Sequence, residues 1–145
     1  MTDHAAFLHS LRPLKDLLLS DSEALEAQIE RAYIANPWFI PAFTKTSIVA
    51  IAEEFLDEQK CSKWMSSYPV VSGGQKRIAV IMAGNLPLVG FHDLFCILAS
   101  GHSAVIKLSE RDATLLPWIT EQWIRIYPDL ASRITYTERF EGYDA

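Results

Sequence analysis

Three polar side chains lie where two apolar runs of the sequence end. Asn85 follows residues 77–83 (RIAVIMA), whereas Lys107 and Glu110 lie at the end of residues 103–108 (SAVIKL) and just after it. If both runs are parallel strands, their carboxyl ends meet at one edge of a sheet, where open parallel sheets bind ligands. An amide there can donate a hydrogen bond to a developing oxyanion, and a lysine with a carboxylate can hold ribose hydroxyls.

Each of these residues also has a purely structural explanation. Asparagine is a favoured helix N-cap, so Asn85 suits the start of the helix predicted after it. Lys107 can lay its alkyl stem over apolar neighbours, and Glu110 is stabilised by the dipole of a helix start. Taken singly, each residue favours the structural explanation. Two such loops at the same edge of one sheet indicate a ligand site more strongly than either loop alone.

The cysteines and histidines offer weaker candidates for chemistry. Cys96 lies in an apolar helical stretch (LFCIL), where a thiol is usually an inert core residue, and Cys61 lies in a predicted helix further upstream. His92 and Asp93 are adjacent in a helix and do not share a face, so packing or capping is favoured over a metal pair or a catalytic dyad. We expect no metal site and no nucleophilic role for either cysteine.

The elements that must position these residues follow from the apolar pattern. Strands are predicted over residues 77–83, 103–108 and 132–137, and helices over 88–100 and 112–127. The order strand, helix, strand, helix, strand predicts right-handed crossovers and an open parallel sheet. Residues 1–70 carry apolar residues at helical spacing, for example Phe7, Leu11 and Leu14. We therefore expect a helical lead-in over 1–70 and an α/β unit over 71–145.

Composition excludes several classes of protein. Half of the 145 residues are hydrophobic and 21% are charged, which is typical of a globular chain. The net charge of −5, without a block of Lys or Arg, disfavours a nucleic-acid partner. The sequence does not open with a basic and apolar signal segment, and no apolar run reaches the roughly 20 residues of a membrane span. The chain has only two cysteines, and cysteine-poor chains are usually intracellular. We expect a cytoplasmic protein without a membrane span.

Residues 81–112 (IMAGNLPLVGFHDLFCILASGHSAVIKLSERD) resemble the first βαβ unit of the cofactor domain of the aldehyde dehydrogenase superfamily. The pattern AGNxPLVGFHD…SGH…KLS resembles the acyl-CoA reductases related to the fatty acid reductase of bacterial bioluminescence. The similarity is closest over residues 77–112 and extends more loosely over 30–145. The chain departs from the wider superfamily at Ala83-Gly84, where Pro-Trp is usual, and at Leu108, where Pro is usual.

The resemblance implies a Rossmann-like sheet of the aldehyde dehydrogenase type, of which this chain would hold the first half. It implies that Asn85 is the amide of the oxyanion hole and that Lys107 and Glu110 hold the adenosine ribose. The implied cofactor-binding residues are Met82, Ala83, Gly84, Lys107, Ser109 and Glu110. The implied cofactor is NADP (as NADPH), with NAD as the other candidate, because Lys107 can also reach a 2′-phosphate.

In the family that this chain resembles, a cysteine thiolate attacks an acyl-CoA thioester, and hydride from NADPH then reduces the acyl-enzyme to an aldehyde. That cysteine would lie downstream of Ala145, so we expect an amino-terminal fragment that is inactive alone, with acyl-CoA as the substrate of the full-length protein. An exposed sheet edge would also offer a surface for a homo-oligomer. The alternative is a non-enzymatic α/β module that serves partner binding or assembly.

Overall fold

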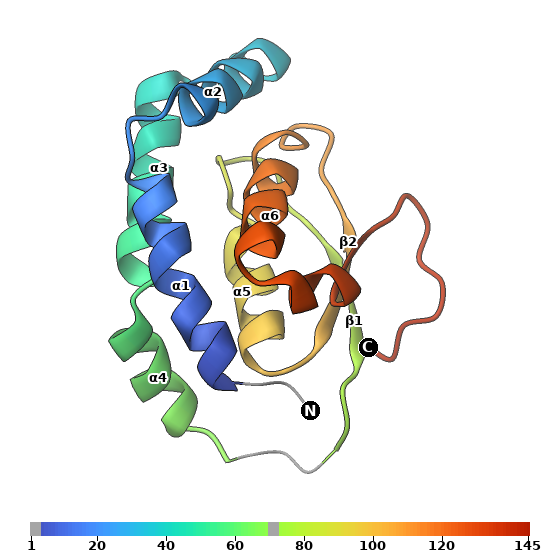
Figure 1. Cartoon of the computed structure of the whole chain (residues 1–145). Coiled ribbons are helices and arrows are strands. Elements are labelled where there is room, and N and C mark those ends of the chain that lie inside the picture. The colour runs from blue at the N-terminus through green and yellow to red at the C-terminus, as the bar shows by residue number, and fades with distance from the viewer. Residues whose placement is uncertain (1–3, 70–72) are drawn as a thin grey trace.

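The computed structural model describes residues 4–69 and 73–145, and the predicted boundary at residues 70 and 71 lies outside these residues (Figure 1). The described chain is α/β, with helices first and a parallel sheet after them. The lead-in contains α1 (His4–Leu18), α2 (Glu23–Ala35), α3 (Pro41–Glu54) and α4 (Glu58–Ser66). The second part contains β1 (Arg77–Ile81), α5 (Phe91–Ala99), β2 (Ser103–Lys107), α6 (Leu115–Ile126), the 3₁₀ helix η1 (Pro128–Ser132) and β3 (Ile134–Tyr136).

Local signals account for the ends of the lead-in helices. Ser22 caps α2, and its Oγ accepts a hydrogen bond from the backbone N–H of Leu25 (3.2 Å). Asp57 caps α4 in the same way, through Lys60 N–H (2.8 Å). Pro41 opens α3, a position where its fixed φ suits the helix and its missing N–H costs nothing.

The three strands form one parallel sheet in the order β1-β2-β3. The predicted α/β class and the three predicted strands are therefore confirmed. Ile81 pairs with Lys107 at the end of β1, so the first two strands end level with each other. The loops that follow them leave the same edge of the sheet, as the sequence predicted.

Helices cover one face of this sheet. Helices α5 and α6 lie on that face (Figure 1), and the hydrogen bond between Thr120 Oγ1 and Tyr136 Oη (2.8 Å) joins α6 to β3 there. The lead-in helices α1 and α3 lie outside α5 and α6, as Figure 1 shows. Residues 137–145 run along the opposite face, drawn in red in Figure 1.

The last residues of the chain occupy the outer edge of β1. Ala79 N–H donates to the carbonyl of Ala145 (2.6 Å), and Asp144 N–H donates to the carbonyl of Arg77 (2.8 Å). The sheet edge along β1 is therefore partly covered, and β3 forms the other edge. Assembly through a sheet edge remains a prediction, and β3 is the strand that it would involve.

A single core joins the lead-in to the α/β unit. Trp123 of α6 is completely buried, and its ring lies 5.6 Å from that of Phe7 and 6.2 Å from that of Phe91. Its indole Nε1–H donates to Ser10 Oγ of α1 (2.8 Å). The buried residues of both parts belong to the same hydrophobic cluster.

Both crossover helices begin three residues later than the apolar pattern predicts. Helix α5 begins at Phe91 rather than residue 88, and α6 begins at Leu115 rather than residue 112. Because Gly90 is the N-cap of α5, the N-cap explanation of Asn85 is wrong. The loops at the strand ends are consequently longer than expected, and they hold the candidate site.

Candidate functional site

The loops that follow β1 and β2 contact each other closely. Met82 N–H donates to the carbonyl of Lys107 (3.0 Å), which extends the strand pairing by one residue. Gly84 is buried, and a Cβ added to it would overlap Ser109 Oγ and lie 3.2 Å from Arg111 Cβ. The structure thus brings four of the predicted cofactor-binding residues together, in the pairs Met82 with Lys107 and Gly84 with Ser109.

The polar groups predicted to act on a ligand remain unpaired. Asn85 and Glu110 are exposed, and Lys107 is half-buried at the end of β2. Ala83, between the two contacts, is also exposed. Among the residues that the structure describes, the side chains of Asn85, Lys107 and Glu110 have no hydrogen-bond or ion-pair partner. An amide, an ammonium and a carboxylate are thus free at one end of the sheet.

A buried carboxylate forms a second link between the loops. Asp112 is only 6% exposed, and its Oδ2 accepts a hydrogen bond from the backbone N–H of Leu88 (2.7 Å). Burial raises the pKa of Asp112 to about 6, against a smaller lowering by the Leu88 amide. Asp112 Oδ1 is buried without a partner within the described part of the chain. The sequence pattern placed residue 112 at a helix start and gave no sign that its side chain reaches the other loop.

Leu88 itself has a strained backbone. Its φ of 61° lies in the left-handed region, which branched side chains rarely adopt. Its side chain is buried and belongs to the hydrophobic core. The Leu88 side chain thus packs in the core, while its backbone N–H is bonded to the Asp112 carboxyl.

The lead-in also reaches the candidate site. Asn36, in the turn between α2 and α3, donates through Nδ2 to the carbonyl of Arg111 (3.1 Å). The same side chain accepts from Trp38 N–H through Oδ1 (3.1 Å), and Phe39 is buried below the turn. The Asn36 side chain therefore connects the lead-in with the loop after β2.

The two cysteines line one hollow of about 230 Å³ between α4 and α5. Cys96 Sγ lies 3.7 Å from His92 Nε2, and His92 Nδ1 lies 3.5 Å from Asp93 Oδ1. Burial raises the pKa of the Cys61 thiol to about 11, and burial followed by the negative charge of Asp93 raises the pKa of Cys96. Both thiols are consequently protonated at neutral pH, and a protonated thiol is a poor nucleophile.

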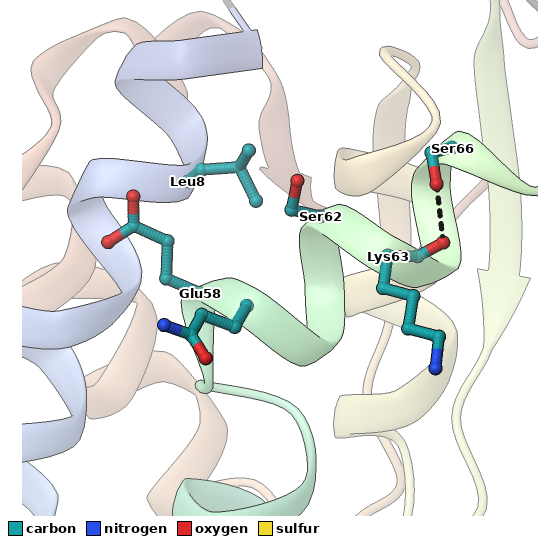
Figure 2. A pocket seen from close by; sticks show the side chains of 6 residues that line it. Leu8, Glu58, Ser62, Lys63 and Ser66 are labelled. Carbon is teal, nitrogen blue, oxygen red and sulfur yellow. Dashed lines mark hydrogen bonds between the residues drawn. The ribbon is translucent and has the colours of Figure 1, made fainter.

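A wider hollow of about 660 Å³ lies between α1 and α4 (Figure 2). Its lining residues are Leu8, Glu58, Gln59, Ser62, Lys63 and Ser66. Figure 2 shows the hydrogen bond from Ser66 Oγ to the carbonyl of Lys63, 2.8 Å long. Neither hollow contains a residue of the two loops at the strand ends.

Comparison with known proteins adds no family to this description. A scan against models of protein families and searches of curated proteins and of solved structures found no match to this chain. None of the helices among the described residues has the length and apolarity needed to cross a membrane. The candidate site is therefore defined by its own geometry.

The contact between the loops predicts a difference between two glycine variants. Gly84→Ala should destabilise the fold by about 1–3 kcal/mol, because the new methyl group overlaps Ser109 and the loops must separate. Gly90→Ala places its methyl group against Met82 Sδ, at the end of a flexible side chain that can move. Urea denaturation of both variants measures the difference. Equal stabilities would show that the Gly84 contact does not hold the loops together.

Proposed function

We propose that this chain is the cofactor-binding part of an acyl-CoA reductase of the aldehyde dehydrogenase type, and that its cofactor is NADPH. The observation that carries the proposal is the amide, ammonium and carboxylate of Asn85, Lys107 and Glu110 on two contacting loops, where they have no partner among the described residues. These loops follow adjacent parallel strands, where open α/β sheets bind ligands. The resemblance of residues 77–112 to that family supplies the reaction, and the fold is compatible with the first half of its Rossmann-like sheet.

The polar groups of the candidate site suit a dinucleotide. An ammonium can donate to ribose hydroxyls and to a 2′-phosphate, and an unpaired carboxylate can accept from the hydroxyls. Lys107 and Glu110 would hold the adenosine ribose, with Met82, Ala83 and Ser109 beside them. Gly84 contributes differently from the expectation, since the space beside its Cα is filled by Ser109. Gly84 would support the candidate site by allowing the loops after β1 and β2 to contact each other.

NADPH, when bound, supplies a hydride to an acyl group. The chain's own residues would bind and orient the cofactor, and the Asn85 amide would donate to the oxyanion that develops on the acyl carbonyl. The family's reaction also needs a cysteine thiolate. Cys61 and Cys96 are both protonated at neutral pH and lie in a different hollow, so we do not expect this chain alone to reduce acyl-CoA.

One observation favours the alternative of a non-enzymatic interaction module. The segment from α2 to α3 carries three large apolar side chains that are mostly exposed, Ile34 (72%), Trp38 (86%) and Phe43 (63%). Exposed apolar groups gathered in one segment are typical of protein–protein contacts. The edge strand β3 offers a second place for assembly, including assembly with another copy of this chain.

A titration of the 145-residue chain with NADPH tests the proposal. We expect saturable binding that Lys107→Ala weakens about 10- to 100-fold, the value of one or two charge-assisted hydrogen bonds. Lys63→Ala, in the hollow of Figure 2, is the matched control and should bind like the wild type. Asn85→Ala should also bind NADPH normally, because its proposed partner is the acyl oxygen.

The same protein samples separate the two functions. If NADPH gives no saturable signal, and sedimentation shows a self-association that Trp38→Ala abolishes, the interaction module replaces the reductase. Equal NADPH affinities for Lys107→Ala and the wild type would remove the assigned cofactor site even if binding occurs.

A further inference from the structure

We propose that Asp112 is a positioning residue, which holds the loop after β1 in the strained conformation that presents Asn85. The inference rests on the proposed function only for the role of Asn85. The hold on the loop is a property of the chain itself, and it can be measured without any cofactor.

The first support is the bond between the loops. Leu88 lies three residues after Asn85, in the turn segment before α5. Its backbone N–H donates to Asp112 Oδ2 over 2.7 Å in a buried setting, where a hydrogen bond to a carboxyl group is strong. Because Leu88 has a φ of 61°, this bond fixes a backbone conformation that a leucine avoids when free.

The second support is that Asp112 does not serve its own helix. Thr114 is the N-cap of α6, and no side chain forms a capping hydrogen bond there. Asp112 lies two residues before this N-cap, and no hydrogen bond joins its carboxyl to an N–H of α6 among the described residues. The carboxyl of Asp112 instead crosses to the other loop.

The third support is the anchoring of Asp112 itself. Its backbone N–H donates to the carbonyl of Ser109 (3.1 Å), and Arg111 N–H donates to Ser109 Oγ (3.2 Å). Asn36 holds the carbonyl of Arg111 from the lead-in. The loop after β2 is thus fixed at three points, and Asp112 can transmit that rigidity to the loop after β1.

The fourth support is the cost of the arrangement. Asp112 Oδ1 is buried with no partner among the described residues, and an unsatisfied buried acceptor lowers stability. A strained residue beside an unsatisfied polar atom is an arrangement that proteins keep at functional sites.

Amide hydrogen exchange at Leu88 tests the hold. We expect Asp112→Ala to speed exchange of this amide at least tenfold and to shift the side-chain amide resonance of Asn85. Asp112→Asn keeps an acceptor, so its Leu88 exchange rate and its Asn85 resonance should match those of the wild type. Asp57→Ala is the matched control, since Asp57 also accepts from a backbone N–H but at α4. The indole N–H resonance of Trp123 reports whether each variant is folded. Should Asp112→Ala fail to fold, Asp112→Glu moves the carboxylate by one methylene, and the same loss of protection is expected.

Unchanged exchange at Leu88 in folded Asp112→Ala or Asp112→Glu would overturn the inference. NADPH affinity, measured in parallel, separates it from the proposed function. If the wild type binds no NADPH while Leu88 responds as expected, the proposed function fails and the positioning role stands. If the wild type binds NADPH and Leu88 does not respond, the positioning role fails and the proposed function stands.

Discussion

Replacing Asp112 with asparagine is expected to remove up to about 3 kcal/mol of pH dependence from the folding of this protein. Burial raises the pKa of Asp112 from 3.8 to about 6 in the folded chain, and each pKa unit corresponds to about 1.4 kcal/mol. A raised pKa means that the fold favours the protonated form. Its contribution to stability is therefore fully present below about pH 4 and is lost as the pH rises through 6.

Chemical denaturation at pH 4.5, 6 and 7.5 measures this effect. The difference in the free energy of unfolding between Asp112→Asn and the wild type should move in favour of the variant as the pH rises. Asp57 provides a control of opposite sign, because the hydrogen bond from Lys60 N–H lowers the pKa of its exposed carboxyl. The benefit of the Asp57 carboxylate should fall as the pH falls. A difference between Asp112→Asn and the wild type that is constant with pH would mean that Asp112 is solvated in the folded protein.

The apolar pattern predicted the sheet because a buried strand can be recognised from residues that are neighbours in the sequence. Residues 77–83 and 103–108 are nearly continuous apolar runs, and a strand buried on both faces requires such a run. The order of elements then gave a parallel arrangement through the handedness of the crossovers. Both conclusions depend on residue types that are neighbours in sequence, and the strands β1 and β2 begin where they were predicted.

The details of the candidate site depend on contacts between distant residues. The bond between Leu88 and Asp112 spans 24 residues, and the bond between Asn36 and Arg111 spans 75. Leu88 is a strong helix former, so periodicity extended α5 backwards over residues that are turns in the structure. The tertiary bond to Asp112 overrides that propensity. The sequence thus indicated that the loops after β1 and β2 leave the same edge of the sheet, but not how these two loops are joined.

The packing of the lead-in against the α/β unit also depends on residues that are far apart in the sequence. Helical spacing predicted an apolar face with Phe7 and Leu11 in the lead-in, and a second apolar face on the helix expected over residues 112–127. It did not indicate that these two faces meet. In the structure they form one hydrophobic cluster, with Trp123 hydrogen-bonded to Ser10 across 113 residues of sequence.

Trp123→Ala is accordingly expected to destabilise the whole chain by about 3–5 kcal/mol, the usual cost of removing a large buried aromatic side chain. Such a loss is comparable with the total stability of many domains of this size. Both parts should unfold in a single transition, because Trp123 packs against Phe7 of α1 as well as Phe91 of α5. The resonances of α1 and α3 follow the lead-in, and the resonances of β2 follow the α/β unit.

Two further variants divide this cost into its physical parts. Trp123→Phe keeps most of the apolar contact but removes the indole N–H, so it leaves Ser10 Oγ without that donor and should cost about 1–3 kcal/mol. Trp38→Ala is the control for loss of a tryptophan, and its side chain is so exposed that the stability should change by less than about 0.5 kcal/mol. Separate transitions for the lead-in and for β2 in Trp123→Ala would show that the lead-in is an independent domain. In that case the contact of Asn36 with the loop after β2 would be a docking contact between two domains, and the candidate site would depend on how they associate.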